Sequence, residues 1–142
     1  MAKKIILIVV VAGLVLFGLI QLVPYGRNHT NPPVVQEIQW DSSETRALAE
    51  RACLDCHSNQ TVWPWYSNIA PASWLLAMDT SEARDHMNFS DWGSRPRSAE
   101  EIARQLERGS MPPSRYLALH PEARLSDAEI AKLIAGFRAS IK

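Results

Sequence analysis

The chain begins with a long apolar run that contains almost no polar side chains. Positions 5–20 hold only apolar residues and glycine, and the run continues to Val23 with one interruption at Gln21. At ~1.5 Å per residue, a helix over residues 5–23 nearly spans the ~30 Å hydrocarbon core of a bilayer. Because every face of this helix is apolar, the pattern favours a membrane-spanning segment over a buried core helix.

The charges around this run predict its orientation. Lys3 and Lys4 precede it, and no basic residue follows it at once, which favours a cytoplasmic N-terminus. We therefore expect residues 1–23 to be a single-pass anchor in the cytoplasmic (inner) membrane, with the rest of the chain facing the periplasm or cell exterior. A cleaved secretory signal is the alternative, although its apolar region is usually ~7–15 residues and no A-x-A-like site follows Val23.

The rest of the chain divides into a linker and one helical domain. Residues 24–40 are rich in proline and lack periodicity, which predicts a linker, and residues 41–142 form one domain by default. Four helix starts are indicated there, at Asp41 or Ser42, Pro71, Ser98 with Glu101, and Ser126 with Glu129. Apolar residues follow each start at helical spacing, such as Leu48, Trp74, Met78, Ile102, Leu106, Leu133, Ile134 and Phe137. Gly109 predicts the end of the third helix, and without an alternating pattern the fold class is all-α.

Charge excludes one class of partner. The chain has 15 Lys and Arg residues against 15 Asp and Glu residues, interleaved along most of its length. A nucleic-acid-binding protein needs a clustered basic surface, so we expect no nucleic-acid partner.

The candidate chemistry lies in Cys53-Leu54-Asp55-Cys56-His57. The chain's two cysteines form a C-x-x-C-H motif, the pattern of covalent c-type haem attachment. Near a helix end, two thiols at this spacing reach the two vinyl groups of one macrocycle, and His57 then becomes the proximal iron ligand. We expect one covalent haem c held by Cys53 and Cys56.

Three other readings of the motif are weaker. A zinc site needs further ligands, and His29, His86 and His120 do not form a closely spaced pair. A redox dithiol is expected within a βαβ pattern, and a disulfide across two intervening residues would constrain little chain entropy.

Met111 is the predicted distal iron ligand. It lies between Gly109-Ser110 and Pro112-Pro113, where the prolines stiffen the loop that would present its thioether. Methionine opposite histidine raises the reduction potential, which suits electron transfer. The alternative ligands are Met78, which we place on the apolar face of its helix, and Met87, His86 and His120.

Aromatic residues are dense after the haem motif. Trp63, Trp65, Tyr66 and Trp74 are candidates for the apolar walls of a haem pocket, although they also fit an ordinary core.

The sequence resembles the bacterial haem-binding domain family of c-type, cytochrome c-like proteins. The resemblance rests on residues 53–59, 63–71, 88–92 and 109–113 and on Leu125-Ser126. It implies a mostly helical cytochrome c-like fold around one haem, with thioether bonds at Cys53 and Cys56 and iron bound by His57.

These features predict a monohaem electron carrier that exchanges electrons with redox partner proteins. No nucleophile or acid–base pair accompanies the motif, so we expect no enzymatic activity. A haem-based gas or redox sensor with a displaceable or absent sixth ligand is the main alternative, and a small peroxidase is a weaker one.

Overall fold

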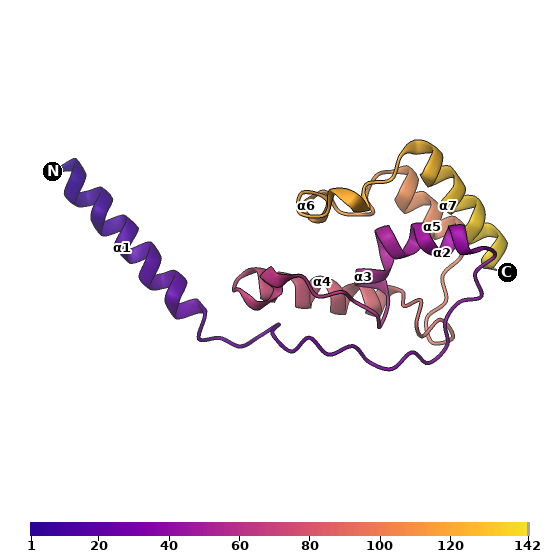
Figure 1. Cartoon of the computed structure of the whole chain (residues 1–142), viewed down its shortest axis with the longest axis horizontal. Helices are drawn as coiled ribbons and strands as arrows, with labels where there is room; N and C mark the ends of the chain where they lie inside the picture. The colour runs from indigo at the N-terminus through magenta and orange to yellow at the C-terminus, as the bar shows by residue number, and fades with distance from the viewer. Residues whose placement is uncertain (142) are drawn as a thin grey trace. The chain divides into compact units, whose positions relative to one another are not determined.

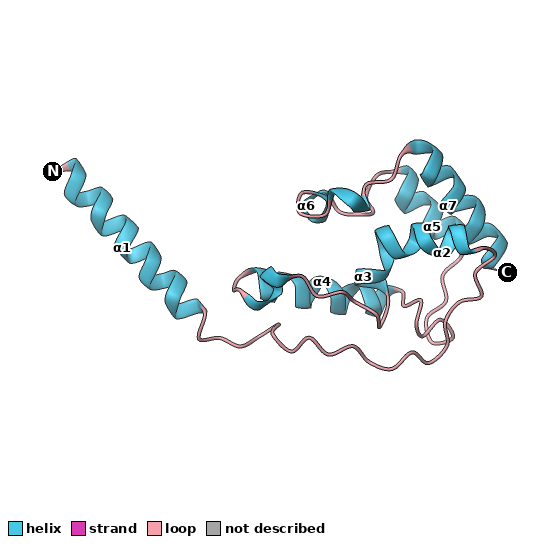
Figure 2. Ribbon diagram, viewed as in Figure 1, coloured by secondary structure: helices cyan, strands magenta, loops and turns pink. Residues whose placement is uncertain are grey.

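The computed structural model describes residues 1–141 and is all-helical, as the sequence predicts. No β-strand occurs within residues 1–141. The elements follow in this order (Figure 1, Figure 2): α1 (Ala2–Ile20), α2 (Ser43–Ala49), π-helical η1 (Glu50–Leu54), α3 (Asp55–His57), 3-10 helix η2 (Trp65–Asn68), α4 (Ala72–His86), α5 (Ala99–Glu107), α6 (Ser114–Leu117), 3-10 helix η3 (Pro121–Ala123) and α7 (Asp127–Ser140).

The described chain forms two compact units. Unit 1 contains residues 1–30 and 63–79, and unit 2 contains residues 31–62 and the chain from residue 80 onward. The prediction that the chain consists of an anchor, a linker and a haem domain divides the chain by function and not by compactness. It stays a prediction.

Unit 2 has its hydrophobic core where α7 packs against α2 and α5 (Figure 1). Phe89 stacks on Phe137 with ring centroids 5.7 Å apart, and Trp92 stacks on the same Phe89 ring at 5.6 Å. The other buried side chains of this core include Leu48, Ala49, Ile102, Ala103, Leu106, Leu133 and Ile134. The apolar positions predicted for α5 and α7, Ile102, Leu106, Leu133, Ile134 and Phe137, are therefore buried, and in α2 the predicted Leu48 is buried as well.

The predicted helix starts of unit 2 are confirmed. Ser98 and Ser126 each accept a hydrogen bond from the backbone N–H of Glu101 and Glu129, and each glutamate bonds back to complete a capping box. At α2 the capping residue is Ser42, whose hydroxyl oxygen accepts from the Thr45 N–H at 3.1 Å. Local side-chain chemistry thus fixes where these helices begin.

Gly136 of α7 lies directly against Thr45 of α2. A Cβ on Gly136 would overlap the Thr45 Oγ1 and Cγ2 atoms and come within 2.8 Å of the Thr45 Cβ. Alanine stabilises a helix by about 1 kcal/mol relative to glycine. Because Thr45 is buried, we expect the steric overlap to outweigh this gain, so that the substitution destabilises the protein. We expect Gly136→Ala to lower the free energy of unfolding by about 1–3 kcal/mol, the usual cost of overpacking, in urea titrations followed by circular dichroism.

The double variant Thr45→Ala/Gly136→Ala tests the cause of that loss. Thr45→Ala removes the two atoms that overlap most, so the two substitutions together should destabilise less than the sum of their separate effects. If the double variant instead lost as much unfolding free energy as the two single variants together, the steric explanation would be contradicted.

Glu129 connects the start of α7 to η1. Its carboxylate accepts the Ser126 N–H at 2.8 Å and the Ser126 hydroxyl at 2.8 Å, and it pairs with the Arg51 guanidinium. The Ser126 backbone hydrogen bond, followed by the Arg51 hydrogen bond, lowers the pKa of Glu129 from 4.5 to about 2. The carboxylate therefore stays ionised in the folded state over a pH range in which it is protonated in the unfolded chain.

This lowered pKa predicts a loss of stability in acid. The contribution of the Glu129 carboxylate to the free energy of unfolding is fully present above its pKa in the unfolded chain, near 4.5. It disappears as the pH falls towards the pKa of about 2 in the folded chain. Between about pH 6 and about pH 3, the urea midpoint should therefore fall less in Glu129→Gln than in the wild type. Glu107→Gln, which removes an exposed carboxylate from α5, controls for the loss of one charge. An equal fall in wild type and Glu129→Gln would contradict the prediction.

In unit 1, α1 is a 19-residue helix with no buried residue. By length and composition it is apolar enough to cross a membrane, a property that it shares with signal sequences. The helix ends at Ile20, three residues before the predicted boundary, because the chain turns at Gln21 and Leu22.

Gln21 joins the end of α1 to the segment before α4. Its Nε2 atom donates to the Ala70 carbonyl oxygen at 2.9 Å, and its Oε1 atom accepts the Ala70 N–H at 2.9 Å. Pro71 then precedes the first residue of α4, Ala72, so the predicted helix start is confirmed to within one residue. Gln21 is thus a structural residue, although it interrupts an apolar run.

Candidate functional site

The haem-type motif lies at the end of one continuous helical run. This run starts as α2, widens into the π-helical η1 that contains Cys53, and finishes as α3, which contains Cys56 and ends at His57. A π-helical turn is uncommon and often marks a functional site. The position of the motif at a helix end agrees with the prediction. The π-helical turn was not predicted from the sequence.

The two cysteines are partly buried and no disulfide joins them. Burial, together with the neighbouring Cys56 sulfur, raises the pKa of the Cys53 thiol to about 12. Reactive redox dithiols have lowered thiol pKa values, so this environment does not resemble a disulfide oxidoreductase. The raised pKa of the Cys53 thiol therefore gives no support to the dithiol reading.

The His57 ring is held by backbone carbonyl groups at the end of α4. Its Nδ1 atom lies 3.1 Å from the Ala83 oxygen and 3.1 Å from the Met87 oxygen. Carbonyl oxygens only accept, so Nδ1 carries the hydrogen and Nε2 keeps its lone pair. Burial lowers the pKa of His57, which favours the neutral ring that a metal ligand requires.

The chain after His57 is fixed to the segment that follows α4. The Phe89 N–H donates to the His57 carbonyl oxygen at 2.8 Å. Arg84 donates from Nε to the Ser58 carbonyl oxygen at 2.8 Å and from Nη2 to the Thr61 hydroxyl at 2.8 Å. These bonds hold the backbone on the C-terminal side of the motif, so His57 is positioned from both its ring and its main chain.

Asparagine and serine side chains complete this attachment. Asn59 is buried; its N–H donates to the Ser90 hydroxyl at 3.0 Å, and its Oδ1 accepts from Asn88 Nδ2 at 2.8 Å. Asn59 Nδ2 donates to the Pro33 carbonyl oxygen at 2.8 Å. The two stretches that carried the family resemblance, 53–59 and 88–92, are thus hydrogen-bonded to each other.

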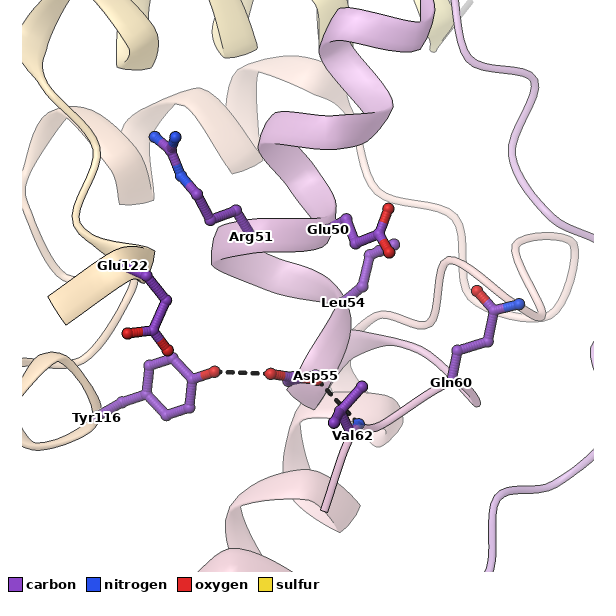
Figure 3. A pocket seen from close by; sticks show the side chains of 8 residues that line it. All are labelled: Glu50, Arg51, Leu54, Asp55, Gln60, Val62, Tyr116 and Glu122. Atoms are coloured by element: carbon purple, nitrogen blue, oxygen red, sulfur yellow. Dashed lines mark hydrogen bonds between the residues drawn. The ribbon is translucent and has the colours of Figure 1, made fainter. Parts of the chain in front are cut away.

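Asp55, between the cysteines, is a site residue that the sequence did not reveal. Figure 3 shows its carboxylate accepting the Tyr116 hydroxyl at 2.9 Å and the Val62 N–H at 3.0 Å. It borders a cavity of about 180 Å³ that is lined by Glu50, Arg51, Leu54, Asp55, Gln60, Val62, Tyr116 and Glu122. Ligand pockets usually measure about 300–1,000 Å³, and neither cysteine nor His57 lines this one, so we assign no cofactor to it.

Met111 lies in the loop between α5 and α6. Gly109, with a φ of 65°, ends α5 as predicted, and the Met111 side chain is 40% exposed rather than packed in the core. Met111 and His57 belong to the same unit, and their binding of one iron stays a proposal.

The alternative ligands have other surroundings. Met78 is 56% exposed on α4, beside the exposed apolar side chain of Leu75 one helical turn earlier. Met87 packs against the core, and exposed His86 lies 3.8 Å from Glu82. His120 stacks on Tyr116 with centroids 4.2 Å apart.

The four predicted pocket aromatics belong to unit 1. Trp63 stacks on His29 with centroids 5.0 Å apart, and Trp65 meets Tyr66 edge to face at 5.8 Å. The indole N–H groups of Trp63 and Trp74 are buried and lack a hydrogen-bond partner. A role for these residues beside haem stays a prediction.

Comparison with known proteins decides the family. No group of three His, Cys, Asp or Glu side chains suited to a metal ion occurs within residues 1–141. The family model described as haem-binding domain matches residues 15–139. The chain belongs to the haem-binding domain family. Membership in this family supports haem as the cofactor, and the neutral His57 ring fits that group. No curated protein and no solved structure matches the chain.

Proposed function

We propose that this chain is a membrane-tethered, extracytoplasmic cytochrome that holds one covalent haem c and transfers single electrons. The observation that carries the proposal is the contact of His57 Nδ1 with the Ala83 and Met87 carbonyl oxygens. This contact leaves Nε2 available to iron in the residue that directly follows Cys56. Lys3 and Lys4, in the first turn of α1, support an N-terminus in the cytoplasm and a haem domain in the periplasm or cell exterior.

Cys53 and Cys56 would attach the haem through thioether bonds. Each thiol adds across one vinyl C=C bond: sulfur bonds to one carbon, and the thiol hydrogen goes to the other. The addition is balanced without an oxidant or a reductant. When bound, the haem supplies an iron that accepts one electron from a reduced partner protein and passes it to an oxidised one.

Met111 is the proposed distal ligand, opposite His57. Pro112 and Pro113 limit the conformations of its loop, which reduces the entropy lost when the thioether is held in one place. A methionine ligand raises the reduction potential, in keeping with a carrier that donates and accepts electrons without transforming a substrate.

Absorption spectra of the purified full chain test this proposal. The oxidised and dithionite-reduced proteins should show sharp low-spin bands, and the oxidised protein should add a weak far-red sulfur–iron band. Haem should remain on the chain in a denaturing pyridine haemochrome assay. A chain from a maturation-competent host that carries no haem would contradict the proposal.

A haem-based sensor is the second candidate. The 40% exposure of Met111, on a loop outside the core, favours a sixth ligand that a small molecule can displace. Carbon monoxide added to the reduced protein separates the two functions: rapid binding would favour the sensor, and an unchanged spectrum would favour the carrier.

A further inference from the structure

Unit 1 exposes apolar side chains in a stretch without charge. We define the unit 1 apolar patch as Trp65, Ile69, Leu75 and Met78, which are 76%, 36%, 47% and 56% exposed. The stretch of residues 63–78 that contains them has no Lys, Arg, Asp or Glu. An uncharged segment that exposes several apolar side chains is suited to contact an apolar or interfacial partner.

The end of α1 is attached to this same stretch. Both atoms of the Gln21 amide group bond to the backbone of Ala70, each at 2.9 Å, and Ala70 directly follows Ile69. A bilayer has a headgroup layer of ~5–8 Å on each side of its hydrocarbon core. A single side chain, that of Gln21, connects the end of α1 to Ala70. Ile69 and the neighbouring η2 therefore lie within the headgroup layer wherever α1 leaves the hydrocarbon core.

The chain that follows α1 covers a different side of α4. Gly26 has a φ of 76°, and a Cβ there would collide with the Ser73 carbonyl oxygen and come within 3.1 Å of the Ala77 Cβ. Leu75 and Met78, three residues apart and therefore neighbours on the helix surface, remain uncovered. The apolar side chains of α4 are thus exposed although the segment beside them is packed.

We propose that the unit 1 apolar patch lies in the headgroup layer of the bilayer that α1 crosses, so that its partner is the lipid surface. The inference rests on the proposed membrane anchoring by α1. Tryptophan prefers this layer because its ring is apolar and its N–H is polar. No charged side chain of residues 63–78 has to be desolvated when the patch enters this layer. Unit 1 is then held on the membrane by a surface as well as by a tether.

Bromolipid quenching of tryptophan fluorescence tests the inference in the full-length, haem-loaded chain. All five tryptophans lie outside α1, so the spanning helix itself contributes no signal. The protein is reconstituted in phosphatidylcholine–phosphatidylglycerol vesicles, with or without bromine on the acyl carbons nearest the headgroups. Trp65→Phe should reduce the bromine-dependent quenching about two-fold or more, since Trp65 is highly exposed in the patch. The matched control, Trp92→Phe in unit 2, should leave it unchanged.

Vesicle flotation and the haem spectrum of the same samples separate the possible failures. If the chain floats with vesicles and keeps its haem, but Trp65→Phe does not reduce quenching, the inference is overturned and the proposed function stands. A chain that does not float overturns membrane anchoring and the inference together. If Trp65 becomes shielded from soluble acrylamide only when a redox partner protein is added, the patch binds protein and the lipid assignment is wrong.

Discussion

Replacing Cys53 and Cys56 together by alanine is expected to give a chain that retains no haem after denaturation. Without thiols no thioether forms, so the cofactor depends on His57 and on packing alone. We also expect the free energy of unfolding to fall by about 4 kcal/mol or more, the stabilisation that a ligand gives at a thousand times its dissociation constant. Haem staining of denaturing gels and urea unfolding measure the two effects.

Single substitutions control for the double variant. Cys53→Ala and Cys56→Ala should each keep haem through the remaining thioether bond. Their pyridine haemochrome bands should shift, because one vinyl group stays unsaturated. Covalent haem in the double variant would show that the attachment is elsewhere and would overturn the site.

Substituting alanine for Met111 is expected to open one coordination position on the iron. The low-spin spectrum should become high-spin, carbon monoxide should bind to the reduced protein, and the far-red band should disappear. The reduction potential should fall by on the order of 100 mV, a fraction of the about 0.8 V range that axial ligands set. Because Met111 is partly exposed and outside the core, the change should not unfold the protein.

Met78→Ala is the matched control for this variant. Met78 is an exposed methionine of unit 1, and its removal should leave the spectrum and the potential unchanged. If Met78→Ala loses the sulfur–iron band and Met111→Ala keeps it, the distal ligand has been assigned to the wrong methionine.

Features that depend on nearby residues were predictable from the sequence. Ser98 and Ser126 start helices because each caps a backbone N–H three residues later, and both caps are present in the structure. The all-α class and the place of the C-x-x-C-H motif at a helix end follow from the same local signals.

Features that depend on distant backbone groups were not predictable. The groups that orient His57 are carbonyl oxygens 26 and 30 residues later in the chain, and a carbonyl group has no signature in the residue type that carries it. The hydrogen bond between Asp55 and Tyr116 spans 61 positions.

The π-helical segment η1 has a consequence for the tolerance of this helix to insertions and deletions. A π-helical turn is equivalent to one extra residue within an α-helix, and each α-helical residue advances the chain by about 100° around the axis. The wider turn absorbs this extra residue, so deleting one residue within η1 would restore a regular α-helix and leave the packed face of α2 nearly in its present orientation relative to the haem motif. Leu48 and Ala49 would then stay in the core while the cysteines kept their positions. The π-helical turn therefore makes η1 the place in this helix where the loss of one residue should be tolerated best.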